Sequence, residues 1–184
     1  GEVVVPAERL LNIVREMPDA EIRLDADERH CVVRGEGSEF RIFVLPAADF
    51  PPLPTFDDEP DVVIDGRQLW RMVNLTIYAA ARETSRYAIN GVLWEKRGKR
   101  LFLVATDGRR LARAGGPVQR TTAADFEVIV PVKALTAFER IFAPGRAQQE
   151  WSVDVKVMPN QVALRSGGRV LSTVLVEGNF PKYE

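Results

Sequence analysis

The sequence has a single cysteine, Cys31, and a single histidine, His30, among its 184 residues. One cysteine cannot form a disulfide within the chain, which is typical of a reducing compartment, and we expect a cytoplasmic, nucleoid-associated location. A zinc site needs several cysteine or histidine ligands, so we expect no metal. The two residues are adjacent on a predicted strand and point to opposite faces, which excludes a catalytic dyad. We therefore expect a half-buried histidine and a core cysteine.

Strong charge of either sign is also missing, because 25 Lys and Arg residues are offset by 26 Asp and Glu residues. DNA binding would therefore require basic residues sorted onto one face. No apolar run approaches the length of a membrane span and no signal peptide opens the chain, so we expect no membrane association. Phosphate-cradling glycine motifs are absent too, and we expect no cofactor. Since the first residue is Gly1 rather than methionine, we expect a fragment or a processed product.

What the sequence does contain is an internal repeat. The string Glu2-Val-Val-Val-Pro6 precedes one predicted helix, and Glu127-Val-Ile-Val-Pro131 precedes another. The closing strings, at residues 47–51 and 177–181, both end in Phe-Pro. A repeated supersecondary unit cannot bury its apolar face alone. The repetition therefore indicates an array with a large repeated surface rather than a single catalytic pocket.

Each repeat is expected to run strand, helix, strand, strand, strand. The first has a strand at residues 3–5, a helix that begins at Pro6, and later strands at 21–24, 30–34 and 39–45. Its helix should bury a stripe at helical spacing, made of Leu10, Ile13, Val14 and Met17. Residues 46–60 contain five prolines and are typical of a linker.

The middle repeat should begin with a strand at residues 61–64 and a helix capped by Asp65. Its predicted strands cover 89–95, 101–106 and 111–114, with a tight turn at Asp107-Gly108, and its helical stripe is Leu69, Met72, Val73 and Ile77. The last repeat has predicted strands at 128–130, 151–158, 161–165 and 169–176, and the helical stripe Leu135, Phe138, Ile141 and Phe142. The fold class is thus α+β, with sheets that carry their helices on one face.

Two longer strings are more specific than any turn signal. They are Leu103-Val-Ala-Thr-Asp-Gly-Arg-Arg-Leu-Ala112 and Ser85-Arg-Tyr-Ala-Ile-Asn-Gly-Val-Leu-Trp-Glu95. With Val5-Pro6, residues 46–51 and Phe180-Pro181, they resemble, in order, the bacterial DNA polymerase III beta subunit family of DNA sliding clamps. The resemblance runs from end to end. It implies the DNA-clamp fold, with helices on the pore side and antiparallel sheets outside.

The resemblance also implies a domain division. Residues 1–55 would be the C-terminal half of the first clamp domain, 56–60 a linker, and 61–184 the middle domain, with repeats at 61–115 and 126–184. Clamps of this family are head-to-tail homodimeric rings, without catalytic activity, that encircle double-stranded DNA. This chain alone is not expected to close such a ring.

Two surfaces are implied by the resemblance. Weak contacts to DNA phosphates would come from basic side chains off the apolar stripes and one aromatic residue: Arg9, Arg67, Arg71, Arg82, Tyr87, Lys133 and Arg140. Ala88 follows Tyr87 where relatives often have a second aromatic residue. A peptide-binding cleft would use Ile89, Thr106, Gly108, Arg109, Arg110, Leu111 and Pro181. Arg109 stands where relatives often have histidine.

The partners implied are the DNA polymerase III catalytic subunit, the clamp loader and other proteins with a clamp-binding motif. Two alternatives remain open from the residues. One is a peptide-binding adaptor of the same fold that never encircles DNA. The other is an enzyme that uses Asp107 or Glu95 as general acid or base, which would require a raised carboxylate pKa.

Overall fold

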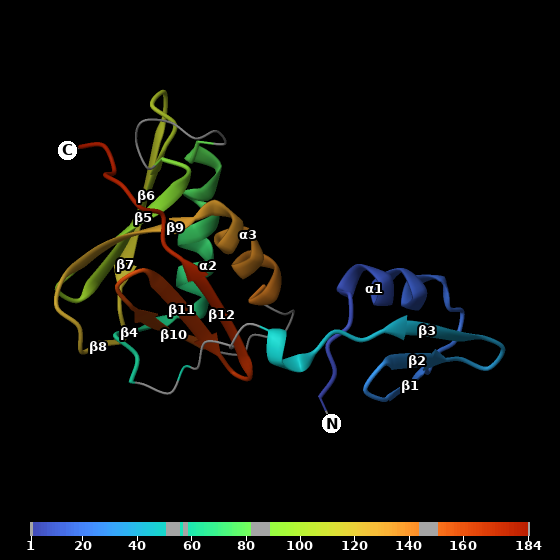
Figure 1. The fold of residues 1–184 in the computed structure, drawn as a ribbon. Coiled ribbons are helices and arrows are strands. Elements are labelled where there is room, and N and C mark those ends of the chain that lie inside the picture. Colours follow the sequence, from blue (N-terminus) through green and yellow to red (C-terminus); the bar gives the residue numbers. More distant parts are fainter. Residues whose placement is uncertain (1, 51–55, 57–58, 82–88, 144–150, 184) are drawn as a thin grey trace. The chain divides into compact units, whose positions relative to one another are not determined.

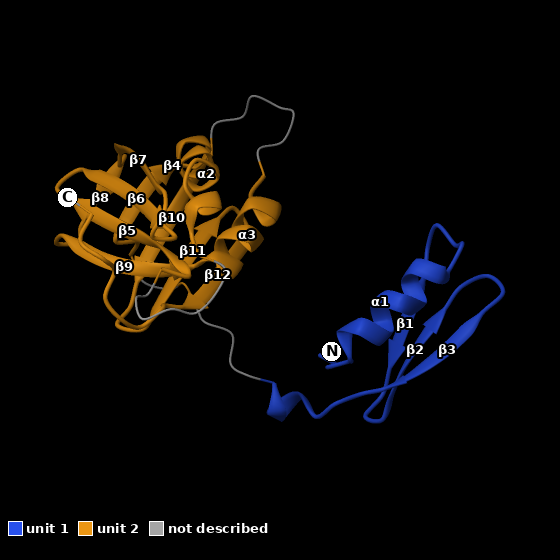
Figure 2. Cartoon of the chain, turned by 90° about the horizontal axis from the view of Figure 1, so that it is seen from above, with its two compact units in different colours: residues 1–53 blue, residues 54–184 orange. Residues whose placement is uncertain are grey.

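The computed structural model describes residues 2–50, 56, 59–81, 89–143 and 151–183. The chain divides into two compact units, Gly1–Leu53 and Pro54–Glu184, called unit 1 and unit 2 below (Figure 2). Each unit has its own buried core, and each is described by itself.

Unit 1 is one helix on a three-stranded antiparallel sheet of order β1-β2-β3 (Figure 1). The elements are α1 (Ala7–Glu16), β1 (Arg23–Ala26), β2 (His30–Arg34), β3 (Glu39–Phe43) and a short 3-10 helix (Ala47–Asp49). Its core consists of Met17, Val33 and Ile42, against which Leu10 and Ile13 of α1 are partly buried. The sequence therefore places the helix correctly.

Several details of unit 1 differ from expectation. The predicted strand at residues 3–5 is reduced to an isolated bridge between Val4 and Leu45, and the strand expected at 21–24 lies at Arg23–Ala26. Val14, expected in the buried stripe, is 39% exposed, because α1 covers only a small sheet. Cys31 is buried and His30 half-buried against the Phe43 ring, as predicted.

The described residues of unit 2 form two α-helices, a short 3-10 helix and two antiparallel sheets. The first repeat of this unit comprises β4 (Val62–Asp65), α2 (Gly66–Asn74), a 3-10 helix (Ile77–Ala79), β5 (Gly91–Arg97), β6 (Arg100–Thr106) and β7 (Leu111–Pro117). After the short β8 (Arg120–Thr121), the second comprises β9 (Phe126–Pro131), α3 (Val132–Ile141), β10 (Ser152–Val157), β11 (Gln161–Ser166) and β12 (Arg169–Val174). The predicted order of elements is confirmed, with strand ends shifted by a few residues.

The two repeats of unit 2 exchange their first strands. β4 pairs with β10 of the second repeat, in a sheet of order β12-β11-β10-β4-β8. In return, β9 pairs with β5 of the first repeat, in a sheet of order β7-β6-β5-β9. Each sheet is therefore built from both repeats, and neither repeat is a separate layer.

The helices α2 and α3 contact each other and share one core with both sheets. Asp65 caps α2 as predicted, since its side chain accepts a hydrogen bond from the Gln68 backbone N–H at 2.8 Å. Leu69 and Phe138 are fully buried over Trp94 of β5. Ile141 was wrongly assigned to the buried stripe and is 37% exposed, because it lies at the edge of that stripe. Ile77, also assigned to a helical stripe, lies in the 3-10 helix beyond the end of α2.

Candidate functional site

Basic side chains lie on the solvent-exposed faces of the helices. Arg67 and Arg71 are one turn apart on α2, and Lys133 and Arg140 are two turns apart on α3. All four are exposed, as is Arg9 on α1. The buried residues Leu69 and Leu135 belong to the opposite faces of these helices. Arg82 and Tyr87, which the sequence also assigned to this surface, lie outside the described residues.

The turn between β6 and β7 is organised by Asp107. Its Oδ1 accepts the backbone N–H groups of Arg109 and Arg110, both at 3.0 Å, and Gly108 has a positive φ of 85°. These two hydrogen bonds are the main reason that the pKa of Asp107 lies below its usual value. The carboxylate thus holds a turn in its ionised form, which is unsuited to a general acid.

Thr106 and Leu111 flank this turn and are direct cross-strand partners. Thr106 is buried, whereas Leu111 is 46% exposed, although it is a large apolar side chain. Strand alternation places both side chains on the face of the sheet opposite the helices. Leu93 and Val104 lie on the same face and belong to a small core cluster that is separate from the main core. Ile89, just before β5, is buried.

The Arg110 side chain is directed away from Thr106 and Leu111, toward Tyr78. Its Nη2 donates to the Tyr78 backbone carbonyl at 3.0 Å, and its guanidinium lies 5.6 Å from the centroid of the Tyr78 ring. It lines a cavity of about 770 Å³ together with Lys133 and Glu139 of α3. The structure therefore brings Thr106 and Leu111 together, but it directs the Arg110 side chain to Tyr78, in a cavity that Lys133 of α3 also lines.

The segment after β12, residues 175–183, runs over the sheet face opposite the helices. The backbone N–H of Leu175 donates to Asn160 and that of Val176 to Ile129. Three side chains then pack against Leu93, Val104 and Ile129; they are Val176, Phe180 and Tyr183. The strand predicted to reach residue 176 ends at Val174, because the chain leaves its sheet to make these contacts. Pro181, a predicted cleft residue, lines a groove of about 720 Å³ between this segment, β5 and β9.

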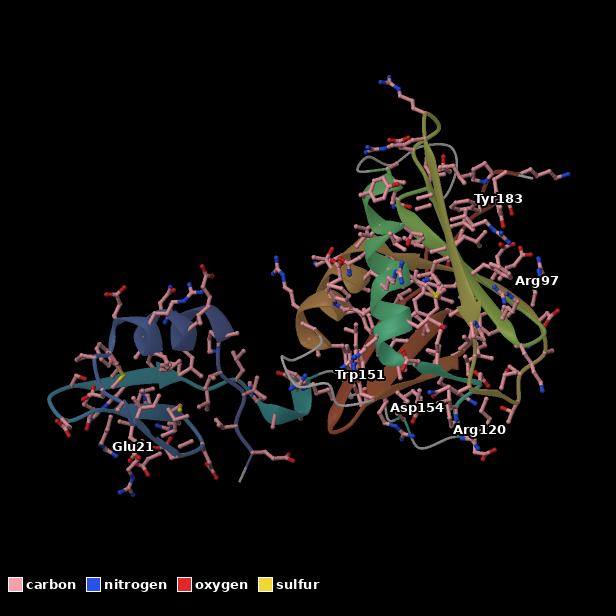
Figure 3. All side chains as sticks on the ribbon, turned by 180° about the vertical axis from the view of Figure 1, so that it is seen from behind. Glu21, Arg97, Arg120, Trp151, Asp154 and Tyr183 are labelled. Atoms are coloured by element: carbon pink, nitrogen blue, oxygen red, sulfur yellow. The ribbon has the colours of Figure 1, made fainter. Side chains whose placement is uncertain are left out.

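Glu95 lies in the same groove and is buried, with an exposed fraction of 8%. Its Oε2 accepts a hydrogen bond from the Tyr183 hydroxyl, and its Oε1 lies 3.5 Å from Arg97 Nη2. Burial and this carboxylate raise the pKa of Tyr183 to about 12. Tyr183 and Arg97 lie on the side of the sheet away from α2 (Figure 3). Sequence reasoning missed Tyr183, whose only signal was its place just after the Phe180-Pro181 string.

An active site built on paired carboxylates finds no support in the described residues. The acids there with a displaced pKa are all displaced downward, by hydrogen bonds to backbone N–H groups or basic side chains; they are Asp27, Glu39, Asp107 and Asp125. Within the same ranges, no group of three or more His, Cys, Asp or Glu residues could hold a metal ion. None of the described helices is long and apolar enough to cross a membrane.

Sequence comparisons give a consistent result along the whole chain. The DNA polymerase III beta subunit central domain matches residues 63–182, and the N-terminal domain of the same subunit matches residues 1–54. The beta sliding clamp of Escherichia coli K12 is 32% identical over 184 residues, which is 100% of this chain and 49% of that clamp. The beta sliding clamp of Caulobacter vibrioides is 32% identical over 190 residues, or 50% of its length. The chain thus spans about half the length of these relatives.

Solved structures agree with these matches. The DNA polymerase III subunit beta from Pseudomonas aeruginosa has a TM-score of 0.85 and 30% identity, covering 100% of this chain and 50% of that one. A sliding clamp from the same organism bound to griselimycin has a TM-score of 0.84, with 30% identity and coverage of 100% and 49%. The Bacillus subtilis sliding clamp, at 24% identity, reaches a TM-score of 0.87 over 99% of this chain and 47% of that one, which supports the fold.

Proposed function

Because this chain belongs to the DNA polymerase III beta subunit family, we propose that it is a segment of a sliding clamp, a non-catalytic processivity factor whose complete form encircles duplex DNA. The single observation that carries this proposal is the family match along the entire chain. We assign residues 1–55 to the second half of a first domain, 56–60 to a linker and 61–184 to a middle domain. A cytoplasmic location and a head-to-tail dimer of the complete protein belong to the same proposal.

DNA would be held by the shape of the ring and by weak attraction to its phosphates. The exposed cations on α1, α2 and α3 support this role; they are Arg9, Arg67, Arg71, Lys133 and Arg140. Those on α2 and α3 lie opposite buried stripes, and Arg9 lies on a helix whose apolar residues are only partly buried. Arg82 and Tyr87 stay in the proposed surface by family resemblance. Contacts of this kind are salt-dependent and carry no sequence information, so a clamp held by them remains free to slide.

The second proposed surface takes short peptides from the polymerase catalytic subunit, the clamp loader and other clamp-binding proteins. Leu111, exposed beside Thr106 on the sheet face away from the helices, supports an apolar contact for a peptide there. Pro181 lies on the segment that crosses the same face, where it lines the groove along β5 and β9. A buried apolar anchor of the peptide would supply most of the affinity. Arg109, exposed at the turn, would contribute charge at the rim, while Arg110 stays in the proposed site by family resemblance, although its side chain contacts Tyr78.

The peptide site is tested by titrating the 184-residue chain with a labelled peptide in which a glutamine precedes apolar residues. We expect saturable binding that weakens roughly tenfold or more in Leu111→Asp, because a charge would replace the apolar contact. Leu24→Asp is the matched control, since Leu24 of unit 1 is 51% exposed. Equal affinity for the unaltered chain and Leu111→Asp would rule the site out.

The mixed charge of the helices, which carry Glu8, Glu16 and Glu139 among the cations, favours the adaptor as a second candidate. Retention of the full-length protein on circular but not on linear DNA would distinguish a topological clamp from that adaptor.

A further inference from the structure

Tyr183 is the last anchor of the segment at residues 175–183. In the described part of the chain, backbone hydrogen bonds hold this segment only at Leu175 and Val176. The residues beyond them form no helix or strand, so side chains must fix their position. Phe180 and Tyr183 do so by packing on the cluster of Leu93, Val104 and Ile129, and their two rings contact each other edge to face at 6.3 Å.

The Tyr183 hydroxyl joins two strands of the sheet. On one side it donates to the buried carboxylate of Glu95 on β5. On the other, the guanidinium of Arg113 on β7 interacts with it, and that guanidinium stacks over the Phe102 ring at 4.2 Å. Loss of a hydrogen-bond donor by a buried carboxylate is costly in free energy. This hydroxyl is therefore specifically placed.

The same network connects the two elements that the proposed peptide site combines, namely β7 with Leu111 and the crossing segment with Pro181. Leu111 and Arg113 are two residues apart on β7 and project from the same face of the sheet. Pro181 and Tyr183 are likewise two residues apart on the crossing segment. The contact between Arg113 and Tyr183 thus links the strand that carries Leu111 to the segment that carries Pro181.

We propose that Tyr183, held by Glu95 and Arg113, is a positioning residue that fixes Pro181 relative to Leu111 and so preorganises the peptide groove. This inference rests on the proposed peptide-binding function. A peptide that meets a fixed groove does not have to order it, and binding is tighter for that reason.

The test compares Tyr183→Phe, which keeps the ring and removes the hydroxyl, with Ser166→Ala, which removes a hydroxyl bonded to the Ser152 carbonyl in the other sheet. Amide hydrogen exchange and peptide affinity are both measured. In Tyr183→Phe we expect the Val176 amide, whose N–H donates to the Ile129 carbonyl, to exchange roughly tenfold faster and the peptide Kd to rise by a similar factor, as for loss of a hydrogen bond to a charged group. In Ser166→Ala neither quantity should change.

A second variant tests the partner. If Glu95 accepts the bond, adding Tyr183→Phe to Glu95→Gln should cost less affinity than Tyr183→Phe alone, because the two residues act as a pair. Unchanged exchange of the Val176 amide in Tyr183→Phe overturns the inference. So does faster exchange with an unchanged Kd, although the peptide site itself would then stand. If the unaltered chain binds no peptide, the proposed function fails, and that result is distinct from the other two.

Discussion

Gly66 is the first residue of α2, and we expect its replacement by alanine to destabilise the protein, although glycine-to-alanine changes in helices usually stabilise it. Replacing a helical glycine by alanine ordinarily stabilises a protein by about 0.5–1 kcal/mol, because alanine loses less backbone freedom on folding. A Cβ at position 66, however, would meet the Trp151 ring at 2.1 Å from Cε3 and 2.2 Å from Cδ2. Ordinary contacts begin near 3.4 Å, so the ring would have to move by more than an ångström.

That movement is resisted from two sides. The Trp151 ring stacks on Phe142, with centroids 6.5 Å apart and planes 7° from parallel, and the Gly66 N–H donates to the Trp151 carbonyl at 2.8 Å. Overpacking of this kind costs about 1–3 kcal/mol. We therefore expect Gly66→Ala to lower the free energy of unfolding of unit 2 by up to about 2.5 kcal/mol, with a central value of about 1 kcal/mol, after the helix propensity is subtracted.

The assay is urea unfolding followed by tryptophan fluorescence. Gly168→Ala is the matched control, because a Cβ there has no atom within 4 Å. Its midpoint should stay close to that of the unaltered chain, whereas the midpoint of Gly66→Ala should fall. A Gly66→Ala chain as stable as the unaltered one would show that the Trp151 contact does not limit this position.

Three further predictions concern charged groups. The folded pKa of Tyr183 is raised to about 12 from the unfolded value of 10.0. Its contribution to stability is therefore complete below pH 10.0 and is lost as pH rises from the unfolded pKa to the folded pKa. Tyr183→Phe should make the free energy of unfolding fall less steeply over that alkaline range. The pKa of Asp107 is lowered, so its contribution to stability is present above 3.8 and is lost as pH falls through the folded pKa. Asp107→Ala should therefore lower the urea midpoint at neutral pH, and the difference from the unaltered chain should shrink at low pH. The Lys96 side chain is 3% exposed, and its Nζ donates to the Ala123 carbonyl and to Asp125. Lys96→Met removes the buried charge and should lower the free energy of unfolding by less than about 1 kcal/mol. Asp125→Ala leaves that charge without one of its partners and should lower the free energy of unfolding by more in the same urea assay.

Local patterns in the sequence were sufficient for the elements of the fold but not for their pairing. Asp65 signals a helix start and Trp151, Val153 and Val155 signal a strand, because capping and alternation depend on near neighbours. The exchange of β4 and β9 between repeats has no such local signal. It follows from long-range packing of two similar repeats around one core.

In the candidate site, too, the sequence predicted local features but not the long-range contacts of their side chains. The string around Leu111 was specific enough to indicate a surface there by resemblance, and the exposed leucine is consistent with that use. The direction of Arg110 depends on Tyr78, which lies on a separate 3-10 helix. The bond between Tyr183 and Glu95 joins residues 88 positions apart, which no spacing rule could have paired.

The exchanged strands of unit 2 have a consequence for its integrity. A single backbone cut between β8 and β9 would leave two pieces that each contribute strands to both sheets. Those pieces would remain associated through β-ladders, and either piece alone would expose the edges that its counterpart had covered. We therefore expect neither half of unit 2 to form its sheets without the other.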